Sequence, residues 1–266
     1  MGCKMIGDKT KYIEHIQDKE QHIVMRKILD KIESVLRHHD VEYTDFLDPY
    51  QRKLSHSILN RLDVSYYEEG GLEDSERKSI IIFPEYMSKE NIENPIKAIK
   101  IEGNFKFTNL RHKDYLGAIL GLGIKREKVG DINIYEDFAI ILLHKELLDF
   151  VIYNLKNIGR ENVTVRQISL GEIEKTKEEF EDIQTTISSL RLDALISGVC
   201  NLSRSKSANQ IAQGKVKVNW QPILNASYEI GEDDVISIRG FGRIKIISEL
   251  GKSKKGKDKV TVRIYK

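Results

Sequence analysis

Short apolar stretches alternate with two helical stretches through the middle of this chain, and that alternation restricts its fold more than any other feature. The predicted strands cover residues 64–67, 79–83, 96–101, 132–135, 138–143 and 163–168. The predicted helices cover residues 112–122 and 145–156, and a glycine lies beyond the end of each, as is common after a helix. Strands that alternate with helices in this way indicate a compact α/β sandwich over residues 63–170.

Residues 1–62 have a different character, because apolar residues recur there at helical spacing over 9–38 with charges between them. Asp48 can cap a further helix, since Pro49 follows it at the first helical position. Residues 171–187 are strongly charged, and we interpret them as a solvated, helical linker. The chain therefore falls in the α+β class, with an N-terminal helical segment, the sandwich, the linker and a C-terminal domain over 188–266.

Composition excludes several classes of protein. No apolar run approaches the roughly 20 residues that cross a bilayer, and the N-terminus lacks the apolar core of a signal peptide. Cys3 and Cys200 are too few for a disulfide framework, which favours a reducing compartment. We therefore expect a cytoplasmic protein without membrane insertion.

The net charge of +2 conceals an asymmetry between the two ends of the chain. Residues 184–266 contain 15 Lys and Arg against 7 Asp and Glu, a net charge of +8, so residues 1–183 carry −6. Such a distribution indicates that the C-terminal part binds a polyanion. The alternative is a basic surface that contacts only solvent. The two short helices at the start of this basic region favour the polyanion.

Two short helices are predicted at the start of the basic region. The first follows Leu190 and ends at Gly198, and the second covers 204–213 behind Ser203, a favourable N-cap residue. Arg204 and Lys206 lie in the first turn of the second helix, where cations oppose the helix dipole at a cost of a few tenths of a kcal/mol. That cost becomes a gain if a phosphate binds the free N–H groups and both side chains.

The order of these residues resembles the RNA-binding domain of ribosomal protein S-four, the αL motif, over about residues 188–240. The resemblance rests on Arg-Leu-Asp at 191–193, Ser203 to Ala208, Gly214, and Val-Lys-Val-Asn at 216–219. It implies a face that binds structured RNA through phosphates, with contacts from Arg191, Ser203, Arg204, Lys206, Asn209, Lys215 and Lys217. Trp220-Gln221 departs from the commoner Gly-Lys type of turn, which either weakens contact by the turn or adds a stacking surface.

Basic residues become denser after this motif. The runs 240–247 and 259–264 predict two strands of a hairpin, joined by a loop rich in lysine. Basic loops between strands commonly contact phosphate, although they can also be simply solvated. The further contacts predicted from this region are Arg239, Arg243, Lys252, Lys254, Lys255 and Lys257.

Motifs for metal binding or catalysis are absent from the sequence: there is no H-E-x-x-H, Cys/His pattern, Walker A loop or nucleophile elbow. We therefore expect no metal, no cofactor and no enzymatic activity. Asp114 is the one residue with both a catalytic and a structural interpretation, because pseudouridine synthases use an aspartate nucleophile and often carry an αL motif. An acid at a helix N-terminus is the simpler interpretation. Gly117 and Gly121, one helical turn apart, are expected to pack closely on the sheet.

The middle of the chain supplies a second resemblance. Residues 114–131 read Asp-Tyr-Leu-Gly-Ala-Ile-Leu-Gly-Leu-Gly-Ile-Lys-Arg-Glu-Lys-Val-Gly-Asp, and with the C-terminal αL motif they resemble the YlmH family of bacterial RNA-binding proteins. The resemblance spans most of the chain and implies an RNA-recognition-like middle domain. It also implies binding to ribosomal RNA of the large subunit and to tRNA, rescue of stalled nascent chains with a partner factor, and a link to cell division.

Second-contact candidates are Arg111, His112, Lys113, Lys125, Arg126 and Lys128. The alternatives are an RNA-modifying enzyme that uses Asp114, and a scaffold for division proteins.

Overall fold

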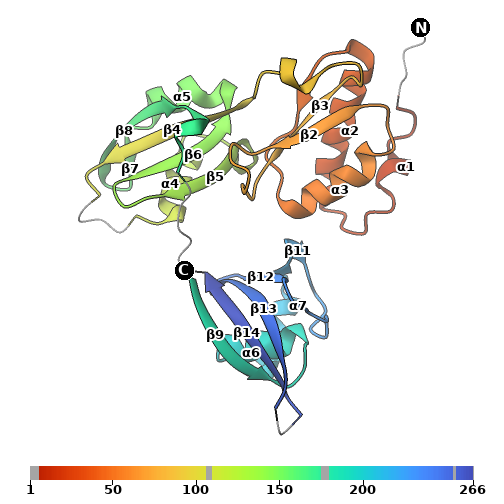
Figure 1. Cartoon of the computed structure of the whole chain (residues 1–266), viewed down its shortest axis with the longest axis vertical. Helices are drawn as coiled ribbons and strands as arrows, with labels where there is room; N and C mark the ends of the chain where they lie inside the picture. Colours follow the sequence, from red (N-terminus) through yellow and green to blue (C-terminus); the bar gives the residue numbers. More distant parts are fainter. Residues whose placement is uncertain (1–5, 106–109, 175–179, 254–255, 266) are drawn as a thin grey trace. The chain divides into compact units, whose positions relative to one another are not determined.

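The computed structural model describes residues 6–105, 110–174, 180–253 and 256–265. These residues form two compact units, one within Met1–Thr176 and one within Lys177–Lys266 (Figure 1). The first unit contains an N-terminal part rich in helix and a middle domain, each built on its own sheet. The predicted α+β class is confirmed.

The N-terminal part packs three helices against a small antiparallel sheet with the strand order β1-β3-β2. Its elements are α1 (Thr10–Ile13), α2 (Gln21–His38), β1 (Glu42–Tyr43), α3 (Pro49–Leu59), β2 (Ser65–Glu69) and β3 (Ser79–Phe83). The predicted cap at Asp48 is confirmed. Its side chain accepts a hydrogen bond from Gln51 N at 2.9 Å, and Gln51 Oε1 accepts one from Asp48 N at 3.2 Å.

The strands β2 and β3 were expected to belong to the middle domain, and this expectation is wrong. β3 pairs with β1 and β2, and Ile80 and Ile82 pack in the same core as Ile28 of α2 and Ile58 of α3. The predicted boundary at residue 62 therefore does not separate the two sheets. Alternation of apolar residues reveals a strand, but it does not identify the distant strand that pairs with it.

The middle domain is a five-stranded antiparallel sheet in the order β5-β6-β4-β8-β7, with both of its helices on one face (Figure 1). Its elements are β4 (Ile96–Gly103), α4 (His112–Gly121), β5 (Val129–Ile134), β6 (Phe138–His144), α5 (Leu148–Asn154), β7 (Asn157–Ile158) and β8 (Glu161–Ile168). Short 3-10 turns occur at η1 (Lys89–Asn91), η2 (Arg126–Lys128), η3 (Lys145–Leu147) and η4 (Leu170–Glu172). Tyr115 of α4 and Val151 of α5 pack on Ile99 and Ile141 of the sheet.

The opposite face of this sheet is partly covered by the N-terminal part. Phe46 packs against Ile140 and Leu142, and its ring stacks on His144 with centroids 4.7 Å apart. Gly117 and Gly121 do not pack on the sheet as expected. Both are exposed, and a Cβ atom at either position would have no neighbour within 4 Å. Tyr115 and Ile119 provide the buried face of α4 instead, so the two glycines lie on its solvent side.

The C-terminal unit is a six-stranded antiparallel sheet in the order β11-β10-β12-β13-β14-β9. Its elements are β9 (Phe180–Ile187), α6 (Leu192–Val199), α7 (Arg204–Ala212), β10 (Val216–Val218), β11 (Gln221–Pro222), β12 (Val235–Ile238), β13 (Gly242–Lys252) and β14 (Asp258–Tyr265). The predicted hairpin is confirmed as β13 and β14. The predicted linker differs, because residues 180–187 are not helical but form β9, which pairs with β14 along its whole length.

The two faces of this sheet have different chemistry. Buried Val and Ile residues on alternate positions, such as Val216, Ile236, Ile244 and Val262, form one core with α6 and α7. The residues between them point to the other side, which we call the outer face. Register places Lys217 opposite Ser237, Ser237 opposite Arg243, and Lys245 opposite Arg263 on that outer face.

Candidate functional site

The N-terminus of α7 is organised by Ser203. Ser203 has an extended backbone, and its Oγ accepts a hydrogen bond from Lys206 N at 3.3 Å, which confirms it as the N-cap. No acidic residue lies in the first turn of α7, where Arg204 and Lys206 stand instead. The positive end of the helix dipole and the two cations therefore act in the same place, which favours an anionic ligand.

A buried carboxylate holds the neighbouring arginines in position. Asp193, in the first turn of α6, has a side chain that is only 8% exposed. Its Oδ1 and Oδ2 accept hydrogen bonds at 3.1 Å from Nε and Nη2 of Arg191, and Oδ2 also accepts one at 2.9 Å from Nη2 of Arg204. Nη1 of Arg204 donates to Ser188 Oγ at 2.6 Å. Burial raises the pKa of Asp193, but the hydrogen bonds from both arginines outweigh it, so the net pKa lies below the ordinary value.

The result is a group of three cations, Arg191, Arg204 and Lys206, which we call the helix-side cluster. The arginine side chains are 41% and 43% exposed, so each remains accessible while Asp193 fixes one edge of its guanidinium group. Lys206 is exposed in the same turn as Arg204. The sequence comparison with αL motifs identified the three cations, but the central role of Asp193 was missed. Its position two residues after Arg191 was the available signal.

The other predicted contacts of the αL motif do not all lie with this cluster. Asn209 is exposed on α7, and its Oδ1 accepts a hydrogen bond from Gln213 Nε2 at 3.2 Å. Lys217 lies on the outer face of the sheet, opposite the face that α7 covers. Lys215 and Arg239 are exposed at adjacent strand ends, where Arg239 N donates to Lys215 O at 2.9 Å. The predicted contacts are therefore distributed over two faces of the unit.

The basic hairpin contributes to the outer face. The guanidinium of Arg243 lies over the ring of Trp220, 5.4 Å from its centroid. Lys252 lies 4.0 Å from Asp258, and Lys257 is exposed. Lys254 and Lys255 lie outside the described residues. Two cations not among the predicted contacts also occupy this face: Lys245, paired with Asp233 at 2.8 Å, and Arg263, which donates to both carboxylate oxygens of Asp182.

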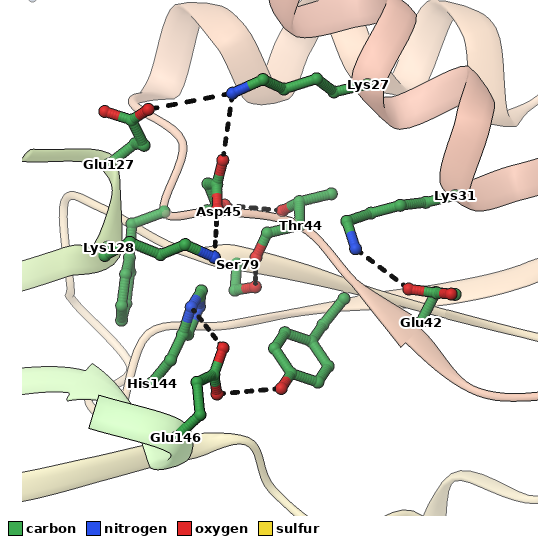
Figure 2. Close-up of polar contacts among 12 residues, drawn as sticks. Lys27, Lys31, Glu42, Thr44, Asp45, Ser79, Glu127, Lys128, His144 and Glu146 are labelled. Atoms are coloured by element: carbon green, nitrogen blue, oxygen red, sulfur yellow. Dashed lines mark hydrogen bonds and ion pairs between the residues drawn. The ribbon is translucent and has the colours of Figure 1, made fainter. Parts of the chain in front are cut away.

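The second-contact candidates in the middle domain separate into two groups. Arg111, His112, Lys113 and Lys125 are exposed around the two ends of α4. Arg126 is turned inward, where its Nη1 donates to the backbone carbonyl of Val129 and burial lowers its pKa to about 10. Lys128 pairs with Asp45 of the N-terminal part at 2.8 Å, in the arrangement that Figure 2 shows. Arg126 and Lys128 therefore make contacts within the first unit. For the four exposed residues, contact with a partner stays a prediction.

Asp114 lies in the first turn of α4. Its Oδ2 accepts a hydrogen bond from Arg111 N at 2.8 Å, which closes a capping box. This is the helix-terminal role that the dipole favours for an acid. Among the residues that the structure describes, no group of three or more His, Cys, Asp or Glu is placed to hold a metal ion. Within the same residues, no helix is both long enough and apolar enough to cross a membrane.

Comparison with known proteins finds three matching families. Residues 20–87 match the N-terminal domain of YlmH, residues 90–172 match an RNA-binding domain in YlmH, and residues 190–236 match the S4 domain. The chain is 34% identical over 243 residues to the ribosome-associated protein quality control protein P2 of Bacillus subtilis (strain 168), covering 91% of this chain and 95% of that protein. A solved structure, the cell division protein ylmH from Streptococcus pneumoniae, is 27% identical with a TM-score of 0.51. The match covers 58% of this chain and 94% of the streptococcal chain.

Proposed function

Since this chain belongs to the YlmH family of RNA-binding proteins and carries a C-terminal S4 domain, we propose that it binds structured RNA on the ribosome through the helix-side cluster. The RNA would be ribosomal RNA of the large subunit together with tRNA. A relative of this chain bears the name of a ribosome-associated quality control protein, which supports a role in clearing stalled nascent chains, with a rescue factor as partner, in the cytoplasm.

The observation that carries the proposal is the pairing of Asp193 with Arg191 and Arg204. Free arginine side chains lose conformational entropy when they bind a phosphate. Here the shared carboxylate has already restricted both guanidinium groups, so less entropy remains to be lost on binding. Lys206 and the N-terminus of α7 add charge beside them. The cluster is therefore suited to the backbone of a folded RNA, which presents phosphates at regular spacing.

The middle domain supports a second, weaker contact in this proposal. Arg111, Lys113 and Lys125 are exposed around the ends of α4. On the solvent side of this helix, Gly117 and Gly121 have no side chains. A contact here, on the same chain as the helix-side cluster, raises the effective concentration of each site for the other. Whether this second partner is RNA or protein is what separates a ribosomal role from a role with division proteins, to which the name of the streptococcal structure points.

Sedimentation with ribosomal subunits tests the proposal. Wild-type protein should sediment with the large subunit at low salt and be released as salt is raised, because phosphate contacts displace counterions. Lys206→Glu should lower the bound fraction several-fold, and Arg204→Glu with Lys206→Glu should abolish binding. Among the described residues the side chain of Lys206 takes part in no hydrogen bond or ion pair, so its single variant is the clearer test of binding, while Arg204→Glu also disturbs Asp193.

A matched control is Lys19→Glu with Lys53→Glu, which changes the charge equally at exposed positions of the N-terminal part. Equal loss in both double variants would mean that total charge, and not the cluster, governs binding. Failure of the wild type to sediment at any salt would contradict the ribosomal role. Asp114→Asn should bind and function normally, and loss of a modified nucleotide in RNA from cells with this variant would favour the enzyme alternative.

A further inference from the structure

Trp220 occupies a backbone conformation that bulky residues rarely adopt. The strands β10 and β11 are joined by two residues, Asn219 and Trp220, with φ of 48° and 66°. A two-residue turn with both φ angles positive favours Asn followed by Gly, because glycine has no Cβ atom to clash. A tryptophan in the glycine position is strained, and such strain persists where surrounding contacts enforce it, often at functional sites.

The contacts that enforce this turn come from Asn219. Its Nδ2 donates to Asp234 Oδ1 at 2.7 Å, and its Oδ1 accepts from Val235 N at 3.0 Å. Its backbone N donates to Val235 O at 2.8 Å. These three bonds attach the turn to the start of β12. The backbone conformation of Trp220 is therefore held in place through its neighbour Asn219.

The indole of Trp220 lies beside a cation of the outer face. The guanidinium of Arg243 lies over the ring, 5.4 Å from its centroid. Register places Arg243 in a row across the outer face with Ser237 on one side and Tyr265 on the other, and Phe180 lies beyond Tyr265. Phe180 is 44% exposed. The guanidinium of Arg263 lies over the Phe180 ring, 3.6 Å from its centroid. The row therefore contains Arg243 and two aromatic residues, and Arg263 of the neighbouring row lies over one of these rings.

We propose that Trp220, with Arg243 beside it, is a stacking site for an unpaired RNA base on the outer face of the C-terminal sheet. Proteins that bind single-stranded nucleic acid combine aromatic rings for the bases with cations for the backbone. The outer face offers Lys217, Lys245 and Arg263 for the adjoining phosphates, so its charge suits RNA better than an apolar peptide. This site rests on the proposed function and adds a preference for unpaired nucleotides, which the helix-side cluster has no means to recognise.

Tryptophan fluorescence provides a direct test, because Trp220 is the only tryptophan in the chain. The full-length protein is titrated with an RNA hairpin whose loop contains unpaired adenines, and with a blunt duplex of the same stem. We expect saturable quenching by the hairpin, since a stacked base changes the indole's surroundings, and little change with the duplex. Trp220→Gly should weaken hairpin binding roughly ten-fold, about 1.4 kcal/mol, and leave duplex binding unchanged.

The variants also control for folding. Glycine suits a positive φ, so Trp220→Gly should keep or raise the unfolding midpoint, and Trp220→Phe should retain most of the affinity for the loop. Hairpin binding without quenching, or equal weakening of hairpin and duplex binding by Trp220→Gly, would overturn the stacking site while leaving the proposed function intact. The outer face would then suit a protein partner better. Absence of binding to both RNAs would overturn the proposed function and this site together.

Discussion

Asp193 is an acid at the centre of a basic surface, and the effect on RNA binding that we propose for it is indirect. It lowers the repulsion between Arg191 and Arg204 and orients both, while its own carboxylate is nearly inaccessible to an RNA. A negative charge that repels RNA from a distance can thus favour binding, because it fixes the cations that stand in front of it. Counting charges along the sequence assigns Asp193 the opposite effect.

Asp193→Asn tests this role. The variant keeps the shape of the side chain but loses the charge that strengthens its bonds to both arginines. We expect the free energy of unfolding to fall by about 1–2 kcal/mol, a range reduced because the arginines are partly solvated. RNA affinity should fall although the net charge becomes more positive. Chemical denaturation and a binding titration measure the two effects, and unchanged or tighter binding would contradict the orienting role.

His144 makes the stability of the first unit depend on pH. It is fully buried between Phe46 and Tyr43, and neither ring nitrogen has a hydrogen-bond partner among the described residues. Glu146 Oε1, at 3.9 Å from Nδ1, is too distant for one (Figure 2). Burial lowers the pKa of His144 to about 4, from an ordinary value near 6.5. The unfolded chain therefore binds the proton more readily than the folded chain between these two values.

We expect this protonation to destabilise the first unit by about 2 kcal/mol as pH falls from 7 to 5. His144→Phe should remove that part of the pH dependence and keep the stack on Phe46, since the ring is similar in size and carries no proton. Denaturation of wild type and variant at several pH values between 4 and 7 measures the difference. Parallel curves for the two proteins would contradict the assignment to His144.

At the scale of elements, the N-cap of α7 coincides with the proposed binding surface, so effects on stability and on binding can be separated there. Ser203→Ala removes the bond to Lys206 N and should destabilise the C-terminal unit by about 1 kcal/mol. Ser203→Asp is an equally good cap, so the unit should remain stable, but its carboxylate would repel phosphate. We expect Ser203→Asp to bind RNA less well than Ser203→Ala, despite greater stability. Thermal unfolding measures the stability of both variants, and titration with RNA measures their affinity. Tighter RNA binding by Ser203→Asp than by Ser203→Ala would contradict the proposed surface.

The edge strand β9 is essential to the C-terminal unit, although the sequence suggested a linker there. It pairs with β14 from Asp258↔Ile187 to Tyr265↔Phe180, and Ile187 belongs to the core. A fragment of residues 177–266 should therefore fold with cooperative unfolding. A fragment of residues 188–266, which follows the predicted boundary, should expose β14 and aggregate or unfold at a lower temperature. Circular dichroism melting compares them, and equal midpoints would mean that β9 is dispensable.

At the scale of the whole molecule, the N-terminal part and the middle domain behave as one unit. Asp131 of β5 accepts hydrogen bonds from Glu76 N at 2.6 Å and Arg77 N at 3.1 Å, and Arg77 Nη2 donates to Phe46 O at 2.6 Å. Gly130 leaves room for Phe46, whose ring a Cβ atom would approach to 2.7 Å. These contacts explain why the sequence motif around Asp131 matters to the fold independently of any RNA.

Asp131→Ala should lower the stability of the first unit alone. Two backbone N–H groups lose their acceptor, which costs about 1–3 kcal/mol for each group left buried. In calorimetry of the full chain we expect one transition to move to lower temperature and the transition of residues 177–266 to stay in place. RNA binding by the helix-side cluster should be unchanged below the first transition. A shift of both transitions would mean that the two units are coupled in stability.

Local pattern was enough to predict most helices and strands, the caps at Asp48 and Ser203, and the cations of the αL motif. Each depends on residues within a few positions of one another, where periodicity and capping chemistry act. Only the tertiary structure could assign β2 and β3 to the N-terminal sheet, add β9 to the C-terminal one, direct Gly117 outward and join Asp193 to Arg204. These features depend on which distant segments meet, and that choice is made by the burial of whole faces together, for which no short stretch of sequence carries the information.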